Sequence, residues 1–193
     1  MGPFETDRLI LRNFVPEDVP VLTNLIYSDR EVWGQYSGYG DKPELLKKSF
    51  MHHVHQLDDA EFGFQAVVLK ETGLAIGQVH LDPYPNIWYH VKDEPSRPGY
   101  SIEVELAFAL GKAFWGQGYA YEACQALINY VFNDLKIPRP LGGANHSNYM
   151  SVRLQRRLGC DLHKNGGPAH PGKSGWLSVL NNPLIDSPPH GPS

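Results

Sequence analysis

The chain has 193 residues, of which 41% are hydrophobic and 20% are charged, and its formal net charge is −4. This size suits one well-filled core, and the composition is typical of a soluble globular protein. The slightly acidic balance argues against nucleic acid or an anionic membrane as a partner, and no apolar run reaches the roughly 20 residues of a membrane-spanning helix. The first five residues lack the pattern of a secretory signal. We therefore expect one cytoplasmic domain over residues 1–182, monomeric or homodimeric.

The N-terminal half contains two amphipathic stretches and a strand pair. Pro16 stands where the first position of a helix tolerates proline, ahead of apolar residues at helical spacing. Four prolines between residues 82 and 100 predict an unusually long loop. In chain order, we expect a strand over 8–14, a helix from Pro16 through Ile26, a helix over 43–57, and strands over 62–69 and 74–81 joined by a turn at 71–73.

The C-terminal half alternates strands and helices. Gly159 stands just after a helical stretch, where glycine commonly ends a helix. The tail over 183–193 is rich in proline and is expected to be disordered. In chain order, we expect strands over 104–110 and 140–146, helices over 119–132 and 148–158, and strands over 160–164 and 176–180. This order is not a repeated strand–helix–strand series, so it predicts an α+β or mixed α/β fold.

The segment between the strand at 104–110 and the next helix contains two closely spaced glycines. Gly116 and Gly118 precede the helix, whose first backbone N–H groups have no partner within the helix. These donors and the positive end of the helix dipole favour a phosphate, and glycine lets it approach closely. A dinucleotide fingerprint would need a third glycine where Tyr121 stands, and no Gly-Lys-Ser/Thr follows for a P-loop. The sequence therefore predicts a diphosphate site at the end of a strand.

Three segments together resemble the GNAT acetyltransferases: Glu105–Leu110, Trp115–Ala123 and Asn148–Gly159. The segment Thr6–Arg12 is similar to the N-terminal signature of the RimJ/RimL-like branch. The resemblance covers roughly residues 5–181. It implies a GNAT-like α+β fold with a central, mostly antiparallel twisted sheet of about seven strands and about four flanking helices. It also implies acetyl-CoA as co-substrate, with no metal.

The same resemblance assigns the residues that hold acetyl-CoA. It implies that backbone amides of the glycine loop hold the diphosphate, that the strand backbone pairs with the pantetheine arm, and that the later helix start contacts the coenzyme. Read from the residues alone, the small side chains of Ala107 and Ala109 leave room for a thin ligand or, alternatively, for an overlying helix. The implied cofactor-binding residues are Phe108, Ala109, Leu110, Trp115, Gly116, Gln117, Gly118, Tyr119, Ala120, Asn148 and Ser151.

Acetyl transfer to an amine needs a proton acceptor and a group that assists the departing thiolate. Glu105 lies on the strand face opposite the packed layer and is our first candidate base, acting through water; an ion pair or solvent exposure is the alternative. His80 is a second candidate, with a hydrogen-bonded structural role as its alternative. By resemblance, Ser151 lies near the sulfur of coenzyme A, although a residue of the first helical turn can also help to cap the helix.

Aromatic residues in two loop regions are candidates for the acceptor site. Aromatic walls with polar tips suit a peptide end or a small amine, and packing under the loops is the alternative. The candidate substrate-binding residues are Trp33, Tyr36, Tyr39, His80, Tyr84 and Trp88. The cluster at 52–55 contains three histidines, but only His52 and His55 share a helix face and no acidic or Cys partner is near, so we expect no metal site.

These features predict an acetyl-CoA-dependent N-acetyltransferase that works by direct attack of the amine in a ternary complex. The branch points to the N-terminal α-amine of a protein such as a ribosomal protein, and a small-molecule amine is the main alternative. At neutral pH roughly a tenth of a free α-amine is deprotonated, against under about a thousandth of a lysine amine, so an α-amine needs only a weak base. A non-catalytic acyl-CoA-binding protein that acts through a partner is the alternative from another class.

Overall fold

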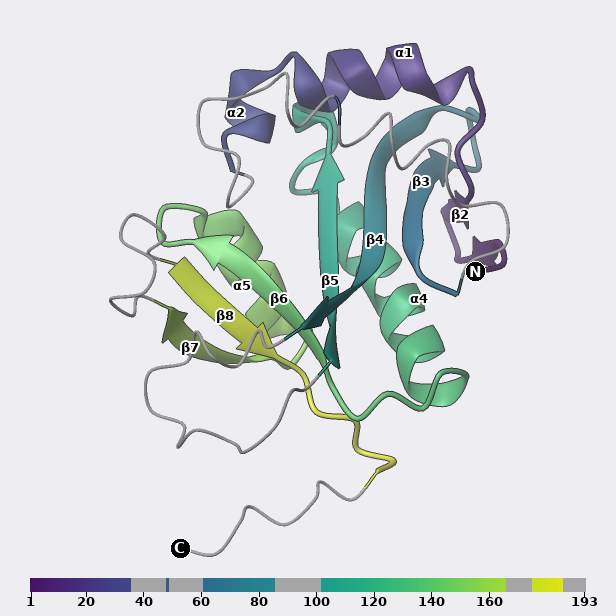
Figure 1. Ribbon diagram of the computed structural model, residues 1–193. Coiled ribbons are helices and arrows are strands. Elements are labelled where there is room, and N and C mark those ends of the chain that lie inside the picture. The colour runs from purple at the N-terminus through teal and green to yellow at the C-terminus, as the bar shows by residue number, and fades with distance from the viewer. Residues whose placement is uncertain (36–47, 49–60, 86–101, 166–174, 186–193) are drawn as a thin grey trace, which may run out of the picture.

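The structure is a computed structural model that describes residues 1–35, 48, 61–85, 102–165 and 175–185. Within these residues, one eight-stranded sheet has the order β1-β2-β3-β4-β5-β6-β8-β7 (Figure 1). Neighbouring strands are antiparallel except for β5 and β6, which are parallel. The strands are β1 (Phe4–Glu5), β2 (Leu9–Arg12), β3 (Gly63–Leu69), β4 (Ala75–Pro85), β5 (Ile102–Leu110), β6 (Pro140–Asn145), β7 (Asp161–Asn165) and β8 (Gly175–Val179). The predicted mixed, mostly antiparallel α+β fold is confirmed.

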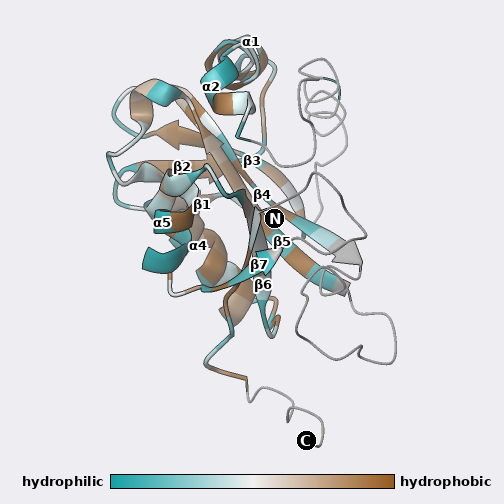
Figure 2. Ribbon diagram, turned by 90° about the vertical axis from the view of Figure 1, so that its left-hand side faces the viewer, coloured by the Kyte–Doolittle hydropathy of each residue, from teal (hydrophilic) through white to brown (hydrophobic). Residues whose placement is uncertain are grey.

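Helices cover both faces of this sheet. Figure 2, turned by 90° from Figure 1, shows α4 and α5 along one side of the sheet and α1 and α2 above its upper end. The described helices are α1 (Asp18–Leu22), which continues as the π-helical η1 (Thr23–Tyr27), then α2 (Arg30–Trp33), the 3₁₀ turn η3 (Lys112–Phe114), α4 (Tyr119–Asn133) and α5 (Tyr149–Arg157). None of the helices in the described ranges is both long enough and apolar enough to cross a membrane.

The alternation of side chains along β5 divides the core into two layers. Val104 and Leu110 are buried against α4, where Leu127 also belongs to the same cluster. Ala109, on the other face, packs with residues of α1, η1 and α2, including Ile26. The predicted packed face of this strand is therefore confirmed, and Ala109 faces the shorter helices.

β5 and β6 are paired over only two positions, Val104 with Pro140 and Glu105 with Leu141. The other edge of β6 pairs with β8 from Leu141 to Asn145. Figure 1 shows β6 leaving the side of β5 towards α5. The last residues of β5 thus have one edge that no described strand pairs, directly before the glycine loop.

Two N-terminal boundaries differ from the predicted ones. The strand predicted over 8–14 is shorter, and a two-residue strand, β1, precedes it and brings the sheet to eight strands. The helix predicted from Pro16 begins at Asp18, because the Asp18 carboxylate accepts hydrogen bonds from the Val15 N–H at 2.9 Å and from Arg12 at 2.6 Å. This cluster holds residues 15–18 as a turn.

The loop predicted over 82–100 was wrong at its start, because β4 continues through Pro85. Pro83 and Pro85 are the Cα partners of Val104 and Ile102. β3 accompanies β4 only as far as Leu81, so beyond that residue one edge of β4 has no described neighbour and a missing N–H costs little. The remainder of this loop, most of the helix predicted over 43–57 and the tail from residue 186 lie outside the described residues.

Candidate functional site

The glycine loop has the backbone that the sequence suggests. Gly116 (φ 73°) and Gly118 (φ 87°) both lie in the left-handed region, which glycine adopts without a steric penalty. Gly118 is the residue before α4 and offers no side chain to cap the helix. Its carbonyl accepts from the Glu122 N–H at 3.1 Å, so helix geometry leaves the N–H groups of residues 119–121 without an intrahelical partner. These groups are the donors that an anion would use.

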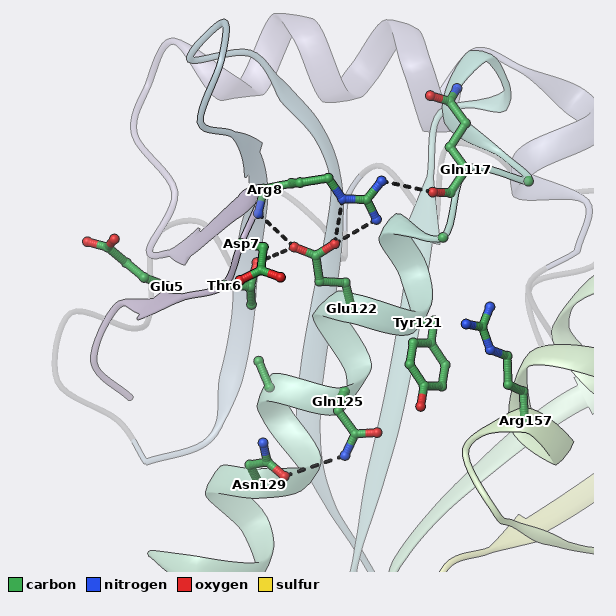
Figure 3. Close-up of a pocket in the computed structure, with 13 residues that line it drawn as sticks. Glu5, Thr6, Asp7, Arg8, Gln117, Tyr121, Glu122, Gln125, Asn129 and Arg157 are labelled. Atoms are coloured by element: carbon green, nitrogen blue, oxygen red, sulfur yellow. Dashed lines mark hydrogen bonds and ion pairs between the residues drawn. The ribbon is translucent and has the colours of Figure 1, made fainter.

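A pocket of roughly 680 Å³ lies beside this loop (Figure 3). Three parts of the chain form it: the β1–β2 connection, the glycine loop with α4, and the end of α5. The lining residues are Glu5, Thr6, Asp7, Arg8, Gly116, Gln117, Gly118, Tyr121, Glu122, Gln125, Ala126, Asn129 and Arg157. Arg157 stacks over the Tyr121 ring, with its guanidinium carbon 4.1 Å from the ring centroid. The pocket therefore combines backbone donors, aromatic surface and a cation.

The end of β5 is fixed by two hydrogen bonds. The Trp115 indole N–H donates to the Leu110 carbonyl at 2.7 Å, and the Gly111 N–H donates to the Ile76 carbonyl at 2.9 Å. The Leu110 side chain is buried and that of Phe108 is partly buried in the core against α4. The pantetheine contact with the backbone of residues 108–110 stays a prediction, and the Leu110 carbonyl already accepts from Trp115.

Glu105 and Glu103 have different surroundings although they share a strand face. Glu103 is buried and accepts from Arg139 at 3.1 and 2.5 Å. Glu105 is half-buried and forms no salt bridge within the described part of the chain. Its Cα partner on β4 is Asp82. Burial, and then the charge of Asp82, raise the pKa of Glu105. A carboxyl group with a raised pKa is suited to proton transfer.

His80 lies on the same face as these carboxyl groups. It is the Cα partner of Ala107, two positions from Asp82, and it is 8% exposed. Its ring stacks on Phe64 with 4.0 Å between centroids. The structure therefore brings His80, Asp82 and Glu105 to one face at the β4–β5 pair.

The start of α5 supports the capping reading of Asn148. Its Oδ1 accepts from the Ser151 N–H at 3.0 Å. Ser151 itself is buried, and its hydroxyl oxygen accepts from Gln155 Nε2 at 3.4 Å. Gln155 also donates to the Gly143 carbonyl at 3.3 Å, so it links α5 to β6. The sequence reading missed Gln155, although a glutamine one helical turn after Ser151 was a usable signal.

Only some of the aromatic acceptor candidates lie among the described residues. Trp33 is 8% exposed and packs with Leu22 and Ile26 in the core under α1, which is what the packing alternative expects. Tyr84 pairs through its backbone with Glu103 on β5. Tyr36, Tyr39 and Trp88 lie outside the described residues, as does the histidine cluster at 52–55. Within the described ranges, no three His, Cys, Asp or Glu residues gather as a metal site.

Known proteins share both the sequence pattern and the fold. The family described as Acetyltransferase (GNAT) domain matches residues 8–161. The uncharacterized N-acetyltransferase p20 of Bacillus licheniformis is 29% identical over 162 residues, 82% of each chain. An acetyltransferase structure from Agrobacterium tumefaciens has a TM-score of 0.69 at 25% identity and covers 94% of this chain and 95% of its own.

A ribosomal-protein-S5-alanine acetyltransferase from Vibrio fischeri also shares the fold. Its TM-score is 0.66 at 16% identity, over 95% of this chain and 98% of its own. The family match extends from Arg8 in the pocket to the start of β7, and so includes the glycine loop, Glu105 and Ser151. The chain therefore belongs to the GNAT acetyltransferase family, in its RimJ/RimL-type group.

Proposed function

We propose that this protein transfers an acetyl group from acetyl-CoA to a primary amine, by direct attack in a ternary complex. The observation that carries the proposal is the glycine loop beside a pocket, after the end of β5, whose last residues no longer pair with β6. Membership of the GNAT family supports N-acetyltransferase activity and acetyl-CoA as the donor. The residues present fit this donor, because Gly118 leaves the first amides of α4 for a diphosphate.

The donor would lie along the unpaired edge of β5. The diphosphate would contact amides over residues 116–120, and the pantetheine arm would pair with backbone groups of residues 108–110. Bound in this way, acetyl-CoA supplies the activated carbonyl. This path leads from the pocket towards Glu105, where β5 and β6 first separate.

In the reaction, the neutral amine nitrogen forms a bond to the thioester carbonyl carbon, and the carbon–sulfur bond then breaks. Glu105, through a water molecule, would accept the proton that the amine loses, and its raised pKa suits this step. Ser151 would donate a hydrogen bond to the departing thiolate. Its oxygen already accepts from Gln155, so its own proton is directed elsewhere.

We propose a protein N-terminal α-amine as the acceptor. The ribosomal-protein acetyltransferase with the same fold supports this choice. The carboxyl groups of Asp82 and Glu105, on one face of the sheet, would attract an amine that arrives protonated. Small-molecule amines are the competing class.

The test combines acetyl-CoA with peptides of varied N-terminal residue and with small amines, and follows thiol release together with the acetylated product by mass spectrometry. A peptide with a blocked N-terminus and an internal lysine is the matched control. Acetylation of the free N-terminus alone supports the proposal. Turnover only on small amines would replace the acceptor, and binding of acetyl-CoA without turnover on any acceptor would favour an acyl-CoA sensor.

A further inference from the structure

A carboxylate stands where the proposed ligand is negatively charged. Glu122 lies in the first turn of α4 and lines the same pocket as Gly116 and Gly118. An uncompensated charge at this position would repel a diphosphate on the neighbouring amides. The surroundings of Glu122 therefore decide whether the loop can accept an anion.

Four donors from the β1–β2 connection surround the Glu122 carboxylate (Figure 3). Oε1 accepts from the Thr6 hydroxyl at 2.6 Å and from the Arg8 N–H at 2.8 Å. Oε2 accepts from Arg8 Nε at 2.7 Å and lies 2.6 Å from Arg8 Nη2. Burial acts to raise the pKa of Glu122, but the hydrogen bonds from Thr6 and Arg8 outweigh it and the pKa is lowered. The ionised Glu122 is thus matched by one guanidinium charge.

The same guanidinium also holds the loop. Arg8 Nη1 donates to the Gln117 carbonyl at 3.1 Å, and the guanidinium carbon lies 4.4 Å from the centroid of the Tyr119 ring. A trans peptide directs its C=O and N–H to opposite sides, and none of the described peptide bonds is cis. With the Gln117 carbonyl turned to Arg8, the Gly118 N–H points away from it. A side chain on Gly118 would begin 3.4 Å from Arg8 Nη2.

We propose that Arg8 is a positioning residue for the diphosphate of the donor: it neutralises Glu122 and fixes the orientation of the Gln117–Gly118 peptide. This inference rests on the proposed function. Arg8 comes from a part of the chain far from the loop, and one side chain sets both the charge and the conformation of the site.

The test measures affinity by calorimetry for coenzyme A, and for pantetheine, which lacks the diphosphate. Arg8→Ala should weaken coenzyme A binding at least roughly tenfold, because an unpaired carboxylate then faces the ligand, and should leave pantetheine unchanged. Glu122→Gln alone should keep the affinity for coenzyme A within about threefold, and Arg8→Ala with Glu122→Gln should recover part of the loss. Arg8→Lys, which keeps the charge, should fall between the wild type and Arg8→Ala.

Arg12→Ala is the matched control, since Arg12, at the other end of β2, forms a similar ion pair with Asp18 and does not line the pocket. It should lower thermal stability without a selective effect on coenzyme A. The inference is overturned if Arg8→Ala binds coenzyme A like the wild type, if it loses both ligands equally, or if the double variant is no better than Arg8→Ala. Failure of the wild type to bind coenzyme A would instead refute the proposed function.

Discussion

Asp82 and Glu105 lie directly opposite each other on the paired strands β4 and β5. Directly opposite residues of an antiparallel pair point to the same face, with their Cβ atoms about 5 Å apart. Burial, and then the charge of Asp82, disfavour the ionised form of Glu105 and raise its pKa. Glu103, two residues earlier on the same face, is instead paired with Arg139.

The first prediction concerns the role of Glu105 in turnover. Glu105→Gln should lower kcat by about 10²-fold, because the amine then lacks its proton acceptor, and should leave coenzyme A affinity unchanged. Steady-state kinetics and calorimetry check the two parts. A rate near that of the wild type would remove Glu105 from the mechanism.

The second prediction concerns the pH dependence of the rate. The wild-type kcat/KM should fall on the acidic side as Glu105 is protonated, and Asp82→Asn should move this fall to lower pH, because one cause of the raised pKa is removed. A pH–rate profile of both proteins measures the shift. An acidic limb that stays in place in Asp82→Asn would contradict the coupling.

The third prediction concerns stability. A carboxyl group whose pKa is raised in the folded state contributes stability below its unfolded pKa, and this contribution is lost as pH rises through the folded pKa. Glu105→Gln should therefore unfold at equal or higher denaturant concentration than the wild type at pH 8, and the difference should vanish near pH 4. Chemical denaturation at the two pH values checks this. A variant that is less stable than the wild type at pH 8 would show that the ionised Glu105 has a stabilising partner.

The fourth prediction separates backbone strain from ligand binding at the glycine loop. Gly118→Ala should cost about 1–2 kcal/mol of folding free energy because of its left-handed backbone, and Gly118→Glu should abolish coenzyme A binding because a carboxylate enters the anion site. Gly73→Ala is the control: its φ is also positive (69°), in the β3–β4 turn, and its Cβ would meet no atom within 4 Å. It should lose similar stability but bind coenzyme A normally. Unchanged affinity in Gly118→Glu would refute the anion site.

The fifth prediction concerns Asn148, for which both a cap and a ligand contact are expected. Asn148→Ala should cost about 1 kcal/mol of folding free energy through loss of the bond to the Ser151 N–H. Asn148→Asp should restore this stability. If Asn148 also contacts coenzyme A, Asn148→Asp should remain weaker than the wild type in calorimetry; full affinity would leave only the cap.

Local pattern was enough to predict the elements around the glycine loop. The alternation along β5 and the two glycines before α4 both express short-range backbone rules, and the structure follows them. The continuation of β4 through Pro83 could not be foreseen, because proline is tolerated there only once β3 has ended on that side. The sequence gives no local sign of where a neighbouring strand stops.

Contacts between residues far apart in the chain were the other feature that the sequence did not predict. Arg8 and Glu122 are 114 positions apart, and Glu103 and Arg139 are 36 apart. Each residue alone looks like an ordinary surface charge, and only the sheet order brings the partners together. The sequence left an ion pair open for Glu105; the fold gives that pair to Glu103.

The length of β5 beyond Glu105 has a consequence for the choice of donor. The strand continues five residues beyond Glu105 to its end at Leu110, which at the rise of a β-strand is about 17 Å, and η3 and the glycine loop follow. If the diphosphate site and the proton acceptor are used as proposed, the length of this strand fixes the distance between them. Acyl carriers with a shorter arm would then leave their carbonyl short of the base, however well the loop held them.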